Sequence, residues 1–465
     1  MTARNRRSAI GGQRSGPADV RRATPLPADA LPDRPFRFSG AVRDLSDADR
    51  RALLERTTSA DPEVREQTRE AIARVRRDGD AALRAMAEEF DGVALETLEV
   101  PRERWAHALA ELPAELRQAL ERARANIARA HTAFRPAAVE VETEPGVVVG
   151  RRADPLERVG VYVPGGRAAY PSSLLMGAVP ARVAGVGEVI VCSPPGRAGL
   201  PASVVLAAAA LAEVDRMFAV GGAGAVAAMA YGTASVPRVD RIVGPGNAYV
   251  VEAKLQLSGV VGIDGPAGPS ELLVIADHTA DPATVARELL AQAEHDPRAA
   301  VVAVAVGDEV AEQVEAAVLR LLPEQERSDV IAQALVGQGG VLVAQTYNEA
   351  VAFANAYAPE HLSLVLADAA LDTVLALVRN AGTVFLGETA SVAFGDYMTG
   401  ANHVLPTGGL ARSYSGLSTL DFVRWTTYQR VTAEAAARLA ADVGRVADSE
   451  RLPGHAAAAR YWARE

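Results

Sequence analysis

The spacing of apolar positions changes several times along this chain and predicts where helices and strands alternate. From Asp61 to about Phe134 the pattern is helical, because Asp61-Pro62 places a capping side chain before a first-turn proline and the run over 113–134 carries one apolar stripe. Residues 138–149 have the short apolar runs of a hairpin. From about Leu420 onward the pattern is again typical of helices.

Between these helical parts, continuous apolar runs of strand length alternate with alanine-rich helical runs. A first series of strands is expected at 157–163, 187–192, 216–220 and 240–243. A second series is expected near 271–276, 299–306, 340–344, 361–366 and 382–386. Continuous apolar strands joined by helices are typical of parallel sheets covered on both faces. We therefore expect an α/β protein with two Rossmann-like parallel-sheet domains, one inserted in the other.

The same patterns predict where the domains begin and end. Residues 1–36 are rich in Arg, Pro, Gly and Ala without periodicity, which is typical of a disordered extension. The remaining parts are an N-terminal arm at 37–60, a discontinuous first α/β domain at 61–156 and 270–416, an inserted second α/β domain at 157–269, and a C-terminal helical tail at 417–465.

Composition narrows the class of protein. The chain has 465 residues, of which 49% are hydrophobic, and 48 basic against 58 acidic residues leave a net charge of −10. This charge disfavours nucleic acid as a partner, and no uninterrupted apolar run approaches the roughly 20 residues of a membrane helix. The single cysteine, Cys192, excludes an internal disulfide and suits a reducing cytoplasm, so we expect a cytoplasmic protein without a membrane partner.

Two residue types are scarce enough to limit covalent chemistry. Cys192 ends an expected strand, where packing in the core is favoured over a role as a thiol nucleophile. Lys254 is the only lysine and falls within an expected helix, where a solvated or salt-bridged position is favoured over Schiff-base chemistry.

The stretch Phe394–Thr407 has neither a helical nor a strand period and contains Asp396 and His403. Long irregular segments in compact domains usually carry function. Asp396 is a hard oxygen ligand or a base, and His403 is a ligand, a proton carrier or a hydrogen-bond donor. The alternative is a glycine-rich surface loop.

Gln292 and His295 are three residues apart at the predicted end of a helix, so they share one of its faces. A carboxamide oxygen and an imidazole in this arrangement could hold a borderline cation such as Zn²⁺. The alternative is a polar helix end beside Pro297.

Glu360 and His361 stand side by side where a loop enters a strand. Adjacent side chains of an extended segment point in opposite directions, so the pair cannot form one simple dyad unless the backbone turns at Pro359. Two separate proton-transfer roles fit better. The alternative is an ordinary strand entry. In the tail, Glu450 and His455 lie five residues apart across a Pro-Gly turn, a spacing that indicates little by itself.

Four glycine-containing turns follow or precede expected strands and carry Tyr162, Gly224, Asn247 and Ser270. The turn at 160–166 ends the first strand of the inserted domain, where a ligand would be met. Residues 222–227 formally match a G-x-G-x-x-A dinucleotide turn, although Asp240 only loosely meets the expected acid. For each turn, plain chain reversal is the alternative.

Taken together, these segments resemble the histidinol dehydrogenase family from about residue 40 to the C-terminus. The motifs that carry the resemblance are Val161-Tyr-Val-Pro-Gly-Gly166, Val243-Gly-Pro-Gly-Asn247, Pro266-Ala-Gly-Pro-Ser-Glu271, Gln292-Ala-Glu-His-Asp296, Ala358-Pro-Glu-His-Leu362 and Gly395-Asp-Tyr-Met-Thr-Gly-Ala-Asn-His-Val-Leu-Pro-Thr407.

The resemblance assigns roles to particular residues. It implies one Zn²⁺ per subunit, with the ligands Gln292, His295, Asp396 and His455. It implies a catalytic pair in which His361 is the base for the alcohol proton and Glu360 activates water. It implies contacts with NAD⁺ at Tyr162, Gly224 and Asn247, and contacts with L-histidinol at Ser270, Gln292, His295, His361, Asp396, His403, Glu450 and His455.

The resemblance also implies a reaction and an assembly. The reaction is the four-electron oxidation of L-histidinol to L-histidine through an aldehyde, with two NAD⁺. The assembly is a homodimer in which the helical terminal segments serve dimerisation and the tail of one subunit supplies Glu450 and His455 to the other. A sulfopropanediol dehydrogenase, a zinc hydrolase and a silent binding protein are the alternatives.

Three positions depart from the family pattern. Gly224 stands where the family usually has a glutamine that would contact the cofactor, Gly265 replaces a bulkier apolar residue, and Arg451 replaces a glycine beside Glu450.

Overall fold

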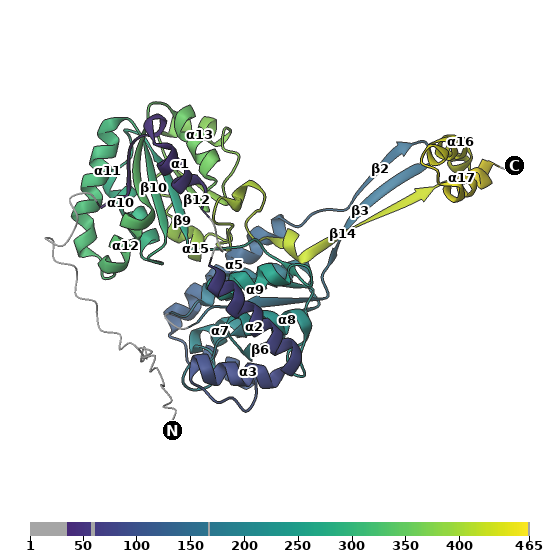
Figure 1. The fold of residues 1–465 in the computed structure, drawn as a ribbon, viewed down its shortest axis with the longest axis horizontal. Helices are drawn as coiled ribbons and strands as arrows, with labels where there is room; N and C mark the ends of the chain where they lie inside the picture. The colour runs from purple at the N-terminus through teal and green to yellow at the C-terminus, as the bar shows by residue number, and fades with distance from the viewer. Residues whose placement is uncertain (1–34, 57–60, 166–167, 464–465) are drawn as a thin grey trace, which may run out of the picture.

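In the computed structural model, two α/β bodies lie side by side and a narrow arm projects from them (Figure 1). The structure describes residues 35–56, 61–165 and 168–463. The expected disordered extension therefore lies almost entirely outside the described residues, as does Gly166 of the first glycine turn. None of the helices in these ranges is long and apolar enough to cross a membrane.

The first body is built on a six-stranded parallel sheet. Its strands, in spatial order, are β1 (Phe38–Ala41), β11 (Gly339–Ala344), β10 (Ala300–Val306), β9 (Glu271–Ala276), β12 (His361–Val365) and β13 (Thr383–Leu386). The helices of this body are α1 (Asp47–Leu54), α10 (Pro282–Ala293), α11 (Asp308–Leu321), α12 (Ser328–Gln338), α13 (Tyr347–Tyr357), α14 (Asp368–Leu375) and α15 (Val392–Tyr397).

Both faces of this sheet are covered. Leu272 and Val274 of β9 belong to the core beneath α10, α11 and α12, whereas Leu273 and Ile275 belong to the core beneath α13. All four side chains are fully buried, which is why the strand reads as a continuous apolar run. The second series of expected strands is confirmed, and β1, within the expected N-terminal arm, adds an edge strand.

The second body is built on a five-stranded parallel sheet. Its strands, in spatial order, are β6 (Arg216–Ala219), β5 (Glu188–Ser193), β4 (Arg158–Tyr162), β7 (Arg241–Val243) and β8 (Gly262–Ile263). Its helices are α2 (Pro62–Asp78), α3 (Asp80–Met86), α4 (Arg102–Ala110), α5 (Ala114–Ala133), α6 (Pro171–Ala184), α7 (Ser203–Leu211), α8 (Gly222–Tyr231) and α9 (Ala248–Leu257).

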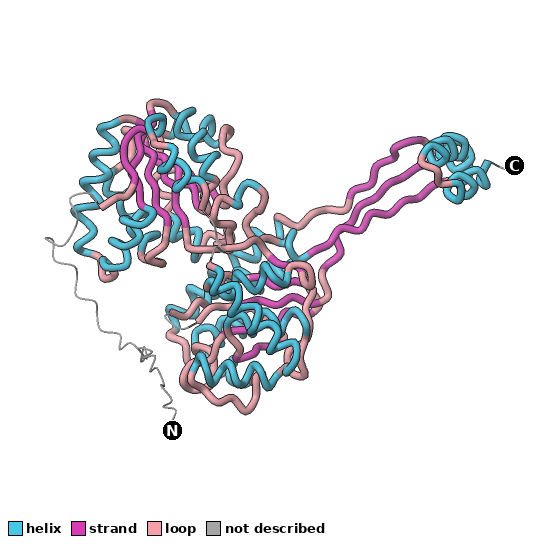
Figure 2. Tube along the Cα trace, in the orientation of Figure 1, coloured by secondary structure: helices cyan, strands magenta, loops and turns pink. Residues whose placement is uncertain are grey.

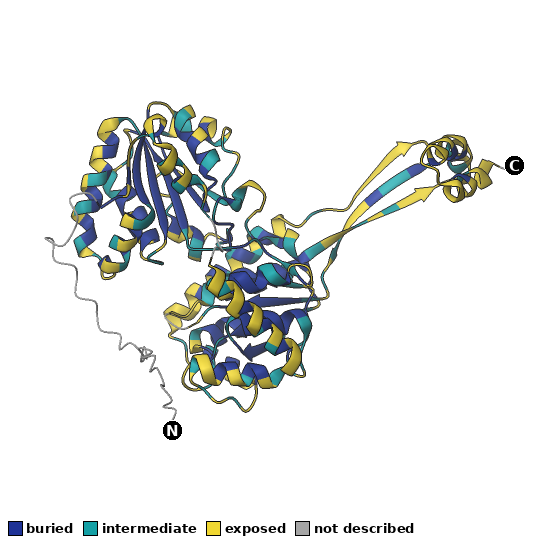
Figure 3. Ribbon diagram, viewed as in Figure 1, coloured by how far each residue is buried: buried dark blue, intermediate teal, exposed yellow. Residues whose placement is uncertain are grey.

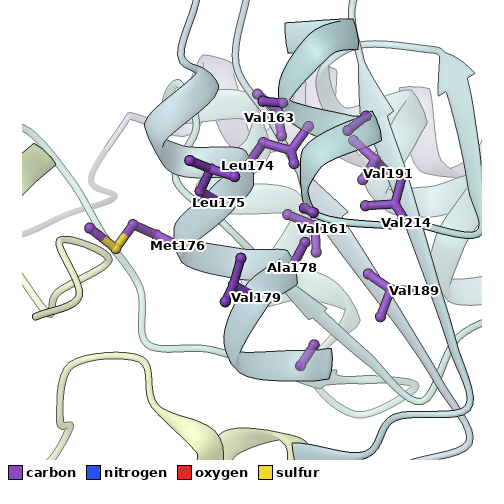
Figure 4. Close-up of a cluster of buried hydrophobic side chains, with 14 of the residues drawn as sticks. Val161, Val163, Leu174, Leu175, Met176, Ala178, Val179, Val189, Val191 and Val214 are labelled. Atoms are coloured by element: carbon purple, nitrogen blue, oxygen red, sulfur yellow. The ribbon is translucent and has the colours of Figure 1, made fainter. Parts of the chain in front are cut away.

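Helices α2 to α5 belong to the second body by their contacts. α2 packs on α8 and α9, α4 packs on α7, and α5 packs on α6. The grouping of residues 61–156 with 270–416 is therefore corrected for these helices, because an apolar helical stripe does not reveal which sheet it covers. Figure 4 shows the core of α6, where Leu174 and Ala178 face Val161 and Val191. Cys192 of β5 is fully buried in the opposite core, and burial raises the pKa of its thiol, so the expectation of core packing is confirmed.

The arm is a three-stranded antiparallel sheet with two helices at its tip (Figures 1 and 2). Its strands, in spatial order, are β14 (Val423–Val431), β3 (Val147–Pro155) and β2 (Val139–Glu144), and its helices are α16 (Ala433–Ser449) and α17 (Pro453–Arg460). The expected hairpin is confirmed as β2 and β3. The all-helical interpretation from Leu420 onward is wrong for β14, because this strand is largely exposed on both faces and lacks a clean alternation (Figure 3).

One buried histidine of α5 predicts acid sensitivity. His131 is 1% exposed, and neither ring nitrogen has a hydrogen-bond partner among the described residues. Burial lowers its pKa from 6.5 to about 4. Between pH 6.5 and about pH 4, His131 binds a proton in the unfolded chain but not in the folded chain. The free energy of unfolding therefore decreases as the pH is lowered through this range. This decrease amounts to about 3 kcal/mol, and His131→Leu is expected to abolish it. Chemical unfolding at a series of pH values from 7 to 4 measures the effect.

The control for this measurement is His107→Leu, which replaces an exposed histidine of α4. The same change in the pH profile for both variants would contradict the assignment to His131.

Candidate active site

A cleft of about 1370 Å³ lies between the two bodies and is lined by residues from both. One wall is the carboxyl edge of the five-stranded sheet, where the turns after β4 and β7 contribute Gly165 and Asn247. The other wall is the amino edge of the six-stranded sheet, where Ser270 precedes β9 and His361 begins β12. In the five-stranded sheet, the strand order reverses between β4 and β7, which is where open α/β sheets bind ligands.

Most of the residues singled out in the sequence line this one cleft. They are Asn247, Ser270, Gln292, His295, Glu360, His361, Asp396 and His403. They come from both bodies and from positions as far apart in the sequence as Asn247 and His403, so only the fold brings them together.

Glu360 and His361 lie against each other, which is the case left open by the sequence if the backbone turns before the pair. The carboxylate Oε2 of Glu360 is 3.4 Å from Nδ1 of His361. The backbone turns just before the pair, where Ala358 is left-handed with φ 52°. Both side chains are held by the backbone of Glu271, whose N–H donates to Glu360 (2.7 Å) and whose carbonyl oxygen accepts from His361 Nδ1 (2.9 Å).

This arrangement directs the other ring nitrogen of His361 toward Asp396. Nε2 is buried, has no hydrogen-bond partner among the described residues, and lies 3.6 Å from Oδ1 of Asp396. Burial opposes a charge on His361, but the carboxylates of Glu360 and Asp396 outweigh it and raise its pKa to about 10. Burial also raises the pKa of Glu360, against the opposing effect of His361.

Glu271 is itself fixed by a buried ion pair that the sequence did not reveal. Its carboxylate accepts from Arg56 Nε (2.9 Å) and Nη2 (3.0 Å), and its Oε1 also accepts from the N–H of Gly408 (2.8 Å). The Arg56 guanidinium stacks over the ring of Tyr357 at 3.4 Å. A bidentate pair of this kind holds planar groups in one geometry, so the backbone beneath Glu360 and His361 is rigidly placed.

The segment Phe394–Thr407 is less irregular than expected, because residues up to Tyr397 belong to α15. His403 Nδ1 is 2.8 Å from the carbonyl oxygen of Asp396, and its Nε2 is 3.1 Å from Oγ of Ser173. A carbonyl oxygen only accepts, so Nδ1 carries the proton and the Ser173 hydroxyl donates to Nε2. Asn126 of α5 donates to the backbone of this segment at Met398 (2.8 Å), which ties it to the second body.

The donors present in the cleft suit a borderline cation. Gln292 and His295 extend from the end of α10, and Asp396 extends from α15. Burial raises the pKa of Asp396, but hydrogen bonding and charge from His361, together with the charges of His403 and His295, lower it overall. These nitrogen and oxygen donors fit zinc. Within the described residues no three His, Cys, Asp or Glu side chains form a metal group, and Gln292 adds an oxygen donor beside His295 and Asp396.

Comparison with known proteins decides the family. The sequence model of the histidinol dehydrogenase family matches residues 54–462 of this chain. The chain belongs to the histidinol dehydrogenase family. It is 49% identical to the histidinol dehydrogenase of Halobacterium salinarum over 90% of this chain and 97% of that protein. It is 44% identical to that of Vibrio parahaemolyticus over 88% of this chain and 95% of that protein.

A solved structure from the same family supports the fold. The crystal structure of histidinol dehydrogenase from Elizabethkingia anophelis superposes with a TM-score of 0.88 at 32% identity. It covers 92% of this chain and 98% of that chain. The likeness in fold therefore extends over nearly the whole length of both chains.

Two residues expected at the cofactor do not line the cleft. Tyr162 is 3% exposed, and its hydroxyl accepts from the N–H of Gly222 (3.1 Å). Gly224 lies inside α8, where a Cβ atom would approach Met86 Sδ to 2.9 Å and Leu83 to 3.4 Å. Gly224 therefore faces the core of the second body, and its contact with the cofactor stays a prediction.

Glu450 and His455 lie at the tip of the arm, away from the cleft of their own chain. Glu450 follows α16, His455 lies in α17, and both are exposed. The cleft walls formed by the described residues include neither of them. Arg451, where the family usually has glycine, is left-handed with φ 58°, a conformation that costs a side chain about 1–2 kcal/mol.

Proposed function

We propose that this chain oxidises L-histidinol to L-histidine through L-histidinaldehyde, with two NAD⁺ and one Zn²⁺ per subunit, in cytoplasmic histidine synthesis. The observation that carries the proposal is the convergence, in one cleft, of the donors Gln292, His295 and Asp396 with the pair Glu360 and His361. The family membership and the 49% identity to a histidinol dehydrogenase support this substrate over a sulfopropanediol.

Zinc would be held by Gln292, His295 and Asp396, with His455 of a second copy of the chain as the fourth ligand. Bound there, zinc supplies an anchor for the amine and imidazole of the substrate through both oxidations. A cation at Asp396 would also offset one of the two carboxylates that raise the pKa of His361, which favours the neutral imidazole that a base requires.

His361 takes the proton of the substrate alcohol. Its Nδ1 is committed to the carbonyl of Glu271, so Nε2 is the nitrogen available for proton transfer. Glu360, held beside it by the N–H of Glu271, removes a proton from the water that adds to the aldehyde. The same pair then serves the second oxidation, and both side chains are buried at the wall of the cleft.

NAD⁺ is expected at the carboxyl ends of β4 and β7, over the turns that contain Gly165 and Asn247. These turns line the cleft at the switch point of the five-stranded sheet. Asn247 also caps α9 by accepting from the N–H groups of Tyr249 and Val250, which fixes the turn against the helix.

A homodimer would complete each site. The arm exposes the large apolar side chains Val139, Val141, Trp425, Val431 and Val446, which a second copy of the chain would cover. Glu450 and His455 at its tip would enter the cleft of the second copy.

The first test removes the metal. Protein treated with a chelator and dialysed is expected to form no NADH from L-histidinol, and added Zn²⁺ is expected to restore it, because the substrate loses its anchor. NADH absorbance measures the result, and 2,3-dihydroxypropanesulfonate is the comparison substrate. Equal turnover of the sulfonate, or full activity in the chelated protein, would contradict the proposal.

Glu360→Gln tests the second oxidation. The amide keeps the size of the side chain but cannot accept a proton from water, so the aldehyde is hydrated slowly. We expect the first NADH to form and the second to follow slowly, so that the overall turnover rate falls about 100-fold. Rapid-quench analysis would detect the aldehyde, and an unchanged yield of histidine would assign water activation to another group.

A further inference from the structure

Lys254 and Asp264 form a buried ion pair next to the cleft. Lys254 lies on α9, Asp264 follows β8, and their side chains are 2% and 5% exposed. The expectation of a solvated lysine is therefore corrected, whereas that of an ion-paired one holds. Neither side chain lines the cleft walls formed by the described residues, so the pair cannot touch a ligand directly.

The two side chains hold the same residue of the backbone. Lys254 Nζ donates to the carbonyl oxygen of Gly244 (3.0 Å), and the N–H of Gly244 donates to Oδ2 of Asp264 (2.7 Å). Gly244 has φ +114°, and a Cβ atom there would overlap the carbonyl oxygen of Tyr162. The turn after β7 is thus pressed against the end of β4 and fixed through both polar groups of its first residue.

This turn forms part of the cleft wall. Gly244 is followed by Pro245, Gly246 and Asn247, all of which line the cleft at the switch point between β4 and β7. We propose that Lys254 and Asp264 are positioning residues for NAD⁺, which act by holding the turn 244–247 in the geometry that receives the cofactor. This inference rests on the proposed function in taking NAD⁺ as the ligand.

The choice of amino acid supports a specific requirement at this position. Of the 48 basic residues of the chain, Lys254 is the only lysine, and the other 47 are arginines. An ammonium group is compact and directs three donors from one atom, whereas a guanidinium is planar and larger. In the buried space between Asp264 and the carbonyl of Gly244 the smaller cation fits, so arginine is not a conservative replacement here.

The surroundings of the pair allow one or both of its charges to be removed by mutation. Arg241 of β7 also acts on the charge of Asp264 and pairs with Asp421 at 3.3 Å. Removing the lysine therefore leaves Asp264 near one other cation. In the double variant Lys254→Met/Asp264→Asn both charges are removed, and the asparagine oxygen still accepts from the N–H of Gly244.

The test measures NAD⁺ binding by calorimetry and the steady-state rates of the zinc-loaded enzyme. Lys254→Met, Lys254→Arg and the double variant are each expected to raise the Kd and KM for NAD⁺ at least tenfold. The kcat at saturating NAD⁺ and the KM for L-histidinol are expected to stay within about threefold, because the zinc donors and His361 are not touched. Thermal unfolding monitored by circular dichroism confirms that each variant is folded.

Arg182→Met is the matched control. Arg182 pairs with Asp215 in the same body, away from the cleft lining, so its loss is expected to lower stability without changing the affinity for NAD⁺. An unchanged Kd for NAD⁺ in the folded double variant would overturn the inference. A wild-type Kd for NAD⁺ in the Lys254→Arg variant would overturn it as well. Wild-type protein that binds NAD⁺ but does not oxidise L-histidinol would contradict the proposed function and leave this binding test intact.

Discussion

His361→Asn is expected to lower kcat for L-histidinol about 1,000-fold, with little change in the KM for NAD⁺. Asparagine can still donate to the carbonyl of Glu271 in place of Nδ1, so the local structure has a substitute for that contact. It has no basic nitrogen to replace Nε2, the atom that lies 3.6 Å from Asp396. Initial rates of NADH formation at saturating substrate measure the effect.

The control is His278→Asn, which replaces an exposed histidine after β9 that does not line the cleft. This variant is expected to retain wild-type kcat. A His361→Asn enzyme within tenfold of wild type would show that another group removes the alcohol proton.

Mixing two inactive variants is expected to restore activity if the site is shared between subunits. His361→Asn impairs the base, and His455→Asn impairs the metal set from the tip of the arm. In a heterodimer of the two, one site carries both changes and the other carries neither. Random reassociation makes about half of the dimers heterodimers, so about a quarter of the wild-type activity is expected.

The measurement uses chains unfolded together and refolded with Zn²⁺, and the two variants refolded separately serve as controls. If each site were formed within one chain, every site in the mixture would carry one change, and no activity above the separate controls would appear. That result would contradict the sharing of each active site between two chains.

The sequence predicted both parallel sheets and most of the cleft because these depend on local patterns. Continuous apolar runs indicate strands buried on both faces, and short motifs place Gln292, His295, Glu360 and Asp396 at element ends. The directions in which the side chains point were harder to predict from the sequence. Glu360 and His361 were expected to point apart unless the backbone turned at Pro359, and the backbone does turn next to it, at the left-handed Ala358.

Long-range packing could not be predicted. Arg56 and Glu271 are 215 residues apart, and no local signal links them, although their pair holds the backbone beneath the catalytic residues. Helices α2 to α5 were assigned to the wrong body for the same reason. The burial of Lys254 depends on Asp264 and on the turn at Gly244, whereas its helical neighbours alone favoured an accessible position.

The most direct test of the proposed function is the stoichiometry of a complete turnover. Zinc-loaded protein is given limiting L-histidinol with excess NAD⁺, and NADH absorbance is followed to its end point while histidine is determined by chromatography. We expect two NADH and one histidine per histidinol. One NADH with accumulation of the aldehyde, or no NADH while another polyol is oxidised, would contradict the four-electron oxidation of histidinol.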